Sequence, residues 1–214
     1  MKIGIVGAEC CGKSTLSAAL NTALQGRYHS VTPVTEYLRE WCLQQGRSPQ
    51  AHEQAHVANM QATRIQQAQA LCVIADTTPL VTAVYSDVLF QDTSLYPRAV
   101  AFQRTLDITL LACPDLPWVA DGTLRDGPAM QQRIDARLRE MLLAHQLPFA
   151  TVYGTGPQRV HAALQAIDHA DATRRAQLPR ATGPAWTWVC DTCSDAECEH
   201  RLFSRLTQDA SVRV

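Results

Sequence analysis

The sequence has no long apolar run and no excess of positive charge. No stretch approaches the roughly 20 apolar residues that a membrane-spanning helix needs. The 19 lysines and arginines are offset by 20 aspartates and glutamates, so we expect no basic surface of the kind that binds nucleic acid. Gly4 and Gly7 interrupt the N-terminal apolar run, which is not the composition of a signal peptide. We therefore expect partners other than membranes and nucleic acids.

Lysine is also nearly absent. Lys2 and Lys13 are the only lysines, and every other cationic residue is arginine. A compact ammonium group fits between phosphate oxygens where a planar guanidinium group does not. The lysine at position 13 of an arginine-rich chain therefore indicates a function for that residue.

Cysteine, by contrast, occurs eight times. In a chain without a secretion signal, such thiols are typical of a reducing compartment, where they stay free or bind metal. This composition predicts a cytoplasmic protein, and it does not indicate an oligomeric state.

Short apolar runs alternate with segments of helical spacing along the chain. Strands are expected at 2–6, within 30–37, and at 70–76, 106–113 and 148–154. Helices are expected after Lys13, from Tyr37 to near Gly46, from Ser48 as N-cap with Pro49 in the first turn to about Ala70, after Pro79, and at 128–146 and 157–169. This alternation predicts a doubly wound parallel sheet flanked by helices.

The chain is expected to divide into three parts. Residues 1–169 carry the alternating pattern and are long enough for one core. Residues 170–185 are polar and contain proline and glycine, so we expect a linker there. Residues 186–214 are expected to form a small Cys-rich tail.

Residues 7–14 read GAECCGKS and match the motif G-x-x-x-x-G-K-[ST], after an expected strand and at the start of an expected helix. This context is typical of a P-loop NTPase, whose loop N–H groups and helix N-terminus bind phosphates. The residues expected to hold ATP are Gly7, Glu9, Cys10, Cys11, Gly12 and Lys13. Lys13 is expected to reach the β- and γ-phosphates, and the Ser14 hydroxyl to ligate Mg²⁺.

Cys10 and Cys11 occupy variable positions of this motif. Because backbone N–H groups bind the phosphates there, we expect both side chains to be weakly constrained. The positive surroundings are expected to lower the pKa of both thiols, so that alkylation inactivates the protein and bound ATP protects it.

Two acidic residues follow other expected strands. Asp76 ends the apolar run LCVIAD, which is a Walker B arrangement. Because neighbouring parallel strands end at one edge, Asp76 and Ser14 are expected to form a Mg²⁺ site, although Asp76 could also cap the next helix. Glu36 follows the second strand, where a carboxylate can orient an acceptor hydroxyl or simply complement a helix dipole.

Aromatic and arginine residues supply further candidates. Tyr37 and Trp41 flank Glu36 and could offer a flat face to a ring, although core packing explains them equally well. Arg125 and Arg133 lie in and after a Gly/Pro-containing stretch. This composition is typical of a lid that closes arginines over a transferring phosphoryl group, and it is also compatible with a solvated helix.

The segments GAECCGKSTL, TEYLREW, VIADTT and LPWVADGTLRDG together resemble the ribosylnicotinamide kinase domain of NadR-type proteins over roughly residues 1–165. The resemblance implies ATP-dependent phosphorylation of nicotinamide riboside to the mononucleotide. By position it assigns phosphate and Mg²⁺ binding to Gly12, Lys13, Ser14 and Thr15, and the Walker B place to Asp76. It assigns the acceptor side to Glu36, Tyr37 and Arg39, and the later substrate and lid motif to Trp118, Asp121 and Arg125.

The chain departs from that family at several points. It begins at the P-loop, so neither the adenylyltransferase nor the DNA-binding function of NadR-type proteins is implied. Thr78 stands where the family tends to carry a second aspartate, and one extra residue lies between Gly122 and Arg125. The Cys-rich tail is not part of the family pattern.

The segment HEQAH at 52–56 matches the zinc-hydrolase motif H-E-x-x-H. It leaves a zinc hydrolase as an alternative of a different class. No third ligand follows at metzincin spacing, because Asn59 and Ala62 occupy those places. Solvated polar residues on an Ala/Gln-rich helix account for the pattern as well.

The tail contains a second possible metal set, made of Cys190, Cys193, Cys198 and His200. Three thiolates and an imidazole can complete a tetrahedral structural Zn²⁺ site, and a segment with so little core would gain stability from it. A disulfide or free thiols are the alternatives.

Together these features predict an ATP- and Mg²⁺-dependent kinase of a small nucleoside-like acceptor, with nicotinamide riboside as the favoured substrate. The alternative is a P-loop ATPase or regulatory ATP-binding module without a small acceptor, which the threonine at position 78 would favour.

Overall fold

The computed structural model describes residues 1–117 and 127–177. Within these residues, one parallel sheet has the strand order β2-β3-β1-β4-β5. Its strands are β1 (Lys2–Val6), β2 (Val31–Val34), β3 (Cys72–Ala75), β4 (Ile108–Ala112) and β5 (Ala150–Val152). The order places β1 between β3 and β4, so the loops that follow these strands are neighbours. The expected doubly wound parallel sheet is confirmed.

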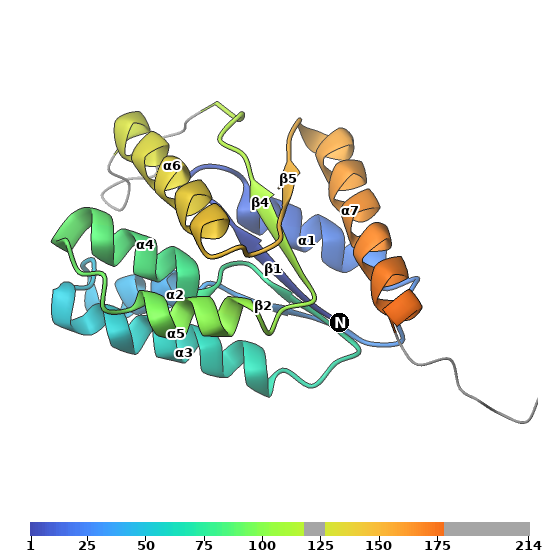
Figure 1. Cartoon of the computed structure of the whole chain (residues 1–214), viewed down its shortest axis with the longest axis horizontal. Coiled ribbons are helices and arrows are strands. Elements are labelled where there is room, and N and C mark those ends of the chain that lie inside the picture. Colours follow the sequence, from blue (N-terminus) through green and yellow to red (C-terminus); the bar gives the residue numbers. More distant parts are fainter. Residues whose placement is uncertain (118–126, 178–214) are drawn as a thin grey trace, which may run out of the picture. The chain divides into compact units, whose positions relative to one another are not determined.

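Helices cover both faces of this sheet (Figure 1). They are α1 (Lys13–Leu24), α2 (Tyr37–Gln45), α3 (Gln54–Gln67), α4 (Pro79–Phe90), α5 (Tyr96–Gln103), α6 (Pro128–Ala144), α7 (Gly156–Gln177) and the short 3-10 helix η1 (Ala51–Glu53). The expected helices are therefore present, with shifted ends. α5 is an addition that the sequence analysis did not foresee, although Pro97 lies in its first turn.

The core is divided by the sheet into two layers. Ile5 and Leu110 pack with residues of α1 and α7 on one face. Leu111, the next residue of β4, packs on the other face with residues of α4, α5 and α6. This alternation explains why the strands are apolar throughout, since both faces of a parallel sheet are buried.

The start of α3 differs from the expectation. Ser48 is not a helix N-cap; the chain instead enters η1 at Gln50, whose side chain and that of Glu53 form a reciprocal capping box. Glu53 accepts a hydrogen bond from the Gln50 N–H at 2.8 Å and a bidentate pair from Arg47. The Q-x-x-E spacing of Gln50 and Glu53 therefore marks the start of this helical segment better than Ser48-Pro49 does.

The end of the domain also differs. α7 continues to Gln177, so residues 170–177 are helical and not part of a linker as expected. No proline lies between Pro157 and Pro179, and the alanines and arginines of residues 170–177 favour helix. The chain divides into one compact unit at Met1–Arg174 and a second at Arg175–Val214, of which the structure describes only residues 175–177. The remaining linker and the tail lie outside the described residues.

None of the helices in the described part of the chain is both long and apolar enough to cross a membrane.

Candidate active site

The P-loop occupies the turn between β1 and α1, at the carboxyl edge of the sheet. A Cβ atom at Gly7 would lie 2.7 Å from both the Ala112 carbonyl oxygen and the Cys11 Sγ atom. Gly12 has a φ of +72° as it enters α1, and Cys10 also has a positive φ of 56°. The motif glycine at position 7 is therefore required by close backbone packing, and that at position 12 by backbone conformation.

Lys13 lies over this loop. Its Nζ atom donates hydrogen bonds to the Gly7 and Ala8 carbonyl oxygens at 3.1 and 2.7 Å. Burial by itself would lower the pKa of Lys13, but the negative charges of the Cys11 thiolate form, Glu36 and Asp76 outweigh it and raise the pKa. Lys13 is thus a protonated ammonium group at the position where phosphates bind in this motif.

Asp76 follows β3 directly, and its side chain meets Ser14 from α1. The Ser14 hydroxyl hydrogen-bonds Asp76 and lowers its pKa, but burial is the larger effect and the net pKa of Asp76 is raised. The Asp76 Oδ1 atom is buried without a hydrogen-bond partner among the described residues. A serine hydroxyl beside a carboxylate with a spare oxygen is a donor set that fits Mg²⁺, which prefers such oxygen ligands.

Glu36 is the N-cap of α2, although its side chain makes no cap hydrogen bond. Its carboxylate lies 3.7 Å from the Arg39 Nε atom and is largely buried. The Glu36 charge raises the pKa of both Lys13 and Asp76. The structure therefore brings Lys13, Ser14, Glu36 and Asp76 to one region of the sheet edge, while Thr15 is exposed in the first turn of α1.

Gln61 of α3, which sequence reasoning missed, joins the two acidic segments. Its Oε1 atom accepts a hydrogen bond from the Tyr37 N–H at 2.8 Å, and its Nε2 atom donates to the Thr77 carbonyl at 3.2 Å. Gln61 is 1% exposed. Gln61 is one of several glutamines in this helix, so the sequence carries no signal that singles it out for such a bridge.

Thr78, the departure from the resembling family, is the N-cap of α4 and turns its side chain into the interior. It is completely buried, and its Oγ1 atom donates to Gln103 Oε1 at 2.8 Å. Gln103 in turn donates to the Thr109 hydroxyl at 2.8 Å. This internal chain of hydrogen bonds satisfies the Thr78 hydroxyl in the interior.

The other candidates on α2 are held by packing contacts. The Tyr37 hydroxyl lies 3.2 Å from His56 Nε2, and the Arg64 guanidinium lies 4.6 Å from the centre of the Tyr37 ring. Trp41 is 7% exposed and packs in a cluster with Val57. Of the two aromatic residues, only Tyr37 keeps a partly exposed position next to Glu36.

The arginines of the expected lid are only partly described. Arg133 is exposed on α6. Trp118, Asp121 and Arg125 lie outside the described residues, so their assignment to substrate and phosphoryl transfer stays a prediction.

Two side chains that contact the P-loop from the C-terminal half of the chain were not foreseen. Gln131 of α6 donates from Nε2 to the Glu9 carbonyl at 2.8 Å, and Arg159 of α7 donates from Nη2 to the Cys11 carbonyl at 2.8 Å. Both are contacts across more than a hundred residues of sequence. Only the folded arrangement of α6 and α7 reveals them.

The expectation for Cys11 is wrong. Its side chain is fully buried in the core layer of α1 and α7 and donates from Sγ to the Ala8 carbonyl at 2.9 Å. Burial raises the pKa of the Cys11 thiol, against the lowering effect of Lys13 and Arg159. The side chain is therefore strongly constrained, and its thiolate form is disfavoured because desolvation outweighs the positive surroundings.

The HEQAH segment does not assemble a zinc site. His52 lies in η1 and His56 in α3, where His56 contacts Tyr37, while Glu53 is paired with Arg47. In residues 1–117 and 127–177, no group of three or more His, Cys, Asp or Glu side chains could hold a metal ion. The second zinc candidate, Cys190, Cys193, Cys198 and His200, lies outside these residues.

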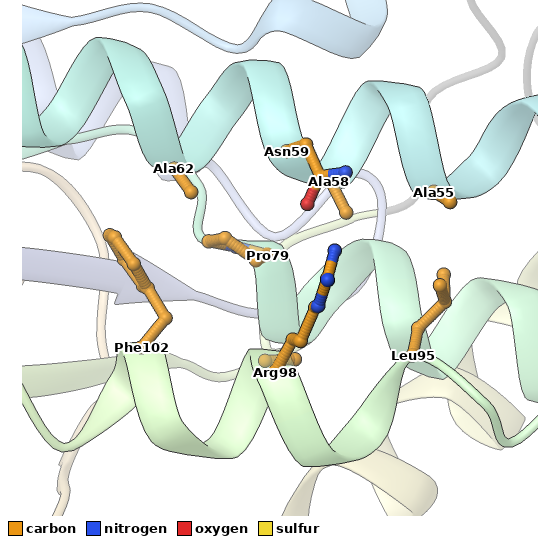
Figure 2. Close-up of a pocket in the computed structure, with 9 residues that line it drawn as sticks. Ala55, Ala58, Asn59, Ala62, Pro79, Leu95, Arg98 and Phe102 are labelled. Atoms are coloured by element: carbon orange, nitrogen blue, oxygen red, sulfur yellow. The ribbon is translucent and has the colours of Figure 1, made fainter.

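Two cavities lie away from the P-loop. One of about 60 Å³ lies between α3, α4 and α5, and Figure 2 shows Arg98 extending across it toward α3. This volume is below the several hundred Å³ of most ligand sites. The other, of about 310 Å³, is lined by Asp107, Ile108 and Pro148 at the amino ends of β4 and β5. Ligands of open α/β sheets bind at the opposite, carboxyl edge, where the P-loop lies.

Solved structures of other proteins share this fold. NadR in complex with NAD and AMP-PNP, and NadR in complex with NR, are each 18% identical with a TM-score of 0.60. The matches cover 80% and 79% of this chain but only 49% and 50% of those chains, so this chain spans about half the length of NadR. The expected structural likeness to NadR is confirmed.

Other similar structures match over almost their whole length. Thymidylate kinase from Ehrlichia chaffeensis is 16% identical with a TM-score of 0.56, over 79% of this chain and 97% of that chain. Deoxyadenosine kinase from M. mycoides is 16% identical with a TM-score of 0.55, over 81% of this chain and 100% of that chain.

Curated proteins include no significant match to this sequence. Among protein families, residues 2–159 match the AAA domain. This range begins at β1 and ends at Arg159, so it includes the P-loop, both acidic residues of the sheet edge and the arginine that contacts the loop. The chain therefore belongs to the AAA domain family.

Proposed function

We propose that this protein is a kinase that transfers the γ-phosphoryl group of ATP to a hydroxyl group of a small nucleoside-like acceptor. The observation that carries the proposal is the meeting of the P-loop with two carboxylates from neighbouring strand ends. Lys13, Ser14, Glu36 and Asp76 interact electrostatically or by hydrogen bonds at this edge. Lys13, Ser14 and Asp76 would bind ATP and Mg²⁺. The largely buried Glu36 carboxylate after β2 would be the additional group that orients an acceptor hydroxyl.

In this mechanism the loop N–H groups and the Lys13 ammonium hold the phosphates of ATP. The raised pKa of Lys13 keeps it protonated, so that it can stabilise the charge that spreads over the transferring phosphoryl group. Ser14 and Asp76 would hold Mg²⁺, which when bound neutralises phosphate charge. Positioning and charge stabilisation account for most catalysis in such sites.

Glu36 would orient the acceptor. It lies at the start of α2, and the Arg39 Nε atom is 3.7 Å from its carboxylate. A carboxylate there can accept a hydrogen bond from the acceptor hydroxyl and then its proton as the oxygen attacks. Tyr37 would line the same side of the site, and Arg39 would contact the acceptor or its transferred phosphate.

Nicotinamide riboside is the acceptor we favour. The proposal is supported by the motifs shared with NadR-type proteins and by the fold likeness to NadR in complex with NR. Thr78, where the resembling family tends to carry a second aspartate, is fully buried and donates a hydrogen bond to Gln103.

A turnover assay tests this proposal. ATP consumption by the full chain is measured with no acceptor and with a panel of nucleosides that includes nicotinamide riboside, deoxyadenosine and thymidine. We expect ATP consumption that depends on an acceptor and is greatest with nicotinamide riboside. Hydrolysis that no nucleoside accelerates would contradict the kinase, and a preference for another nucleoside would contradict the favoured acceptor.

Two variants complete the test. Lys13→Ala should abolish turnover, since the loop loses its only ammonium group. Glu36→Gln should lower kcat by about 10²- to 10⁴-fold, the usual contribution of a positioned general base, and leave the affinity for ATP nearly unchanged. Glu40→Gln is a matched control, because Glu40 lies one helical turn further along α2 and pairs with Arg64.

A further inference from the structure

Five carbonyl groups of the P-loop accept hydrogen bonds from the protein itself. Lys13 donates to the carbonyls of Gly7 and Ala8, and the α1 residue Leu16 donates its N–H to Gly12 at 2.9 Å. The carbonyls of Glu9 and Cys11 accept hydrogen bonds from side chains of distant helices. An anion site made of backbone needs this arrangement, because its N–H groups must face the anion while the carbonyl oxygens face away.

The donor to Cys11 is Arg159, near the start of α7. Arg159 is 4% exposed, and its Nη2 atom donates to the Cys11 carbonyl at 2.8 Å and to the Cys113 carbonyl at 2.9 Å. Its Nη1 atom donates to Asp115 Oδ1 at 2.6 Å and to the Gly154 carbonyl at 2.9 Å. One planar guanidinium group thus joins the P-loop to the segments that follow β4 and β5.

The donor to Glu9 is Gln131, in the first turns of α6. Its side chain is 5% exposed, and its Nε2 atom lies 2.8 Å from the Glu9 carbonyl oxygen. The next residue, Gln132, is exposed to solvent. The amide of Gln131 is therefore a buried polar group whose donor is directed at the loop.

We propose that Gln131 and Arg159 are positioning residues that hold the P-loop in its phosphate-binding conformation. Each fixes one loop carbonyl away from the phosphates and so keeps the neighbouring N–H groups turned toward them. Without its donor, a carbonyl is free to rotate inward, where its partial negative charge repels the phosphate oxygens. The proposal rests on the proposed function only in taking ATP as the ligand.

The role predicts a loss that is specific for the β- and γ-phosphates. AMP keeps the base, the ribose and the α-phosphate of ATP. It lacks the β-phosphate, which the loop N–H groups and the lysine contact, and the γ-phosphate, which the lysine reaches. A variant that merely loosens the fold would weaken both nucleotides to a similar extent. A variant that misplaces loop carbonyls would weaken ATP and spare AMP.

The experiment compares Gln131→Met and Arg159→Lys with the wild-type full chain. Methionine keeps the length of Gln131 without its donor, and lysine keeps the charge of Arg159 without the fork that reaches two carbonyls. The matched controls are Gln132→Met on the exposed side of α6 and Arg27→Lys, which affects a surface ion pair with Asp168. The Kd values of Mg²⁺·ATP and AMP are measured by displacement of a fluorescent ATP analogue, and the melting temperature without nucleotide checks folding.

We expect each test variant to weaken ATP binding about three- to tenfold, the value of one buried hydrogen bond, with the Kd of AMP changed less than about twofold. Both controls should match the wild type. Unchanged ATP affinity, or equal losses for ATP and AMP, would overturn the proposal. If Arg159→Lys does not fold, Gln131→Met decides. The outcome is separate from that of the turnover assay, since a chain that phosphorylates no nucleoside can still show the ATP-specific loss.

Discussion

At the scale of single residues, burial and neighbouring charges shift the pKa values of the site residues in opposite directions. Lys13 keeps its charge in a partly buried position because carboxylates lie near it, whereas Asp76 is pushed toward its neutral form mainly by burial. Bound Mg²⁺ would favour the ionised form of Asp76, so nucleotide, metal and proton binding are expected to be coupled here. At the same loop, the pKa of Cys11 is raised because burial outweighs the opposing charges of Lys13 and Arg159.

Cys11 provides a direct test at this scale. We expect its thiol to resist iodoacetamide at pH 8 in the folded protein and to react on unfolding in urea, because burial raises its pKa and closes access. Peptide mass spectrometry after alkylation measures the modified fraction at this position. Rapid modification of Cys11 in the native protein, prevented by ATP, would instead restore the original expectation of an accessible reactive thiol.

At the scale of elements, α6 both packs in the core and carries a side chain that contacts the P-loop. Its apolar face packs on the sheet through Ile134, Leu138 and Leu142, all fully buried, and its first turns carry Gln131 toward the P-loop. Arg137 anchors the same helix to Asp87 of α4 at 2.7 Å. The helix is therefore held firmly enough to position a side chain at the loop.

Two leucines of α6 form a matched pair for stability measurements. Leu138→Ala should lower the free energy of unfolding by about 2–5 kcal/mol, since it leaves a cavity in the core. Leu143→Ala should change it by less than about 0.5 kcal/mol, because Leu143 is 67% exposed. Urea unfolding monitored by circular dichroism gives both values, and a similar cost for the two substitutions would contradict this packing of α6.

The cap before α3 predicts a pH dependence. Hydrogen bonds from Arg47 and then from the Gln50 N–H lower the pKa of Glu53 to about 2. Because the folded-state pKa lies below the ordinary value, the stabilisation is complete above about pH 4.5 and is lost as the pH falls toward 2. Glu53→Gln should therefore be less stable than the wild type at pH 7, with a difference that shrinks below about pH 4.5.

Urea unfolding of both proteins between pH 3 and pH 7 measures this difference. A substitution at the neighbouring Gln54 would be a poor control, because Gln54 is buried. Glu140→Gln, on the exposed side of α6, serves as the control carboxylate instead. A difference between Glu53→Gln and wild type that does not vary with pH would show that the carboxylate is not held by Arg47.

At the scale of the whole molecule, residues from both halves of the sequence contact the P-loop. β1 and α1 supply the loop, β3 supplies Asp76, and α6 and α7 supply Gln131 and Arg159. Nucleotide binding at this loop should therefore stabilise the domain as a unit and not α1 alone.

Thermal unfolding measures that linkage. ATP with Mg²⁺ at 100 times its Kd should stabilise the folded chain by about 2.7 kcal/mol and raise the melting temperature by several degrees. Lys13→Ala should remove most of the shift, whereas Arg27→Lys should keep it. A melting temperature that ATP does not change would contradict a nucleotide site at this loop.

Much of this arrangement was predictable because it depends on local pattern. The apolar runs around Ile5, Ile74 and Leu110 are too short for helices and too apolar for exposed strands, so a buried parallel sheet follows from them. The phosphate-binding role proposed for Lys13 was predicted from the motif and from the scarcity of lysine in the chain. The nearness of Asp76 and Ser14 follows from the common edge at which parallel strands end.

Other features could not be predicted because they depend on contacts between distant segments. The sequence itself determined the sheet, the P-loop and the acidic residues that follow β2 and β3, since each is encoded by neighbouring residues. Only the tertiary structure decided that Thr78 turns inward to Gln103, that Cys11 is a core residue, and that Gln131 and Arg159 reach the loop. The physical reason is that burial and hydrogen-bond pairing of a polar side chain are set by the helices that pack around it, and not by its neighbours in sequence.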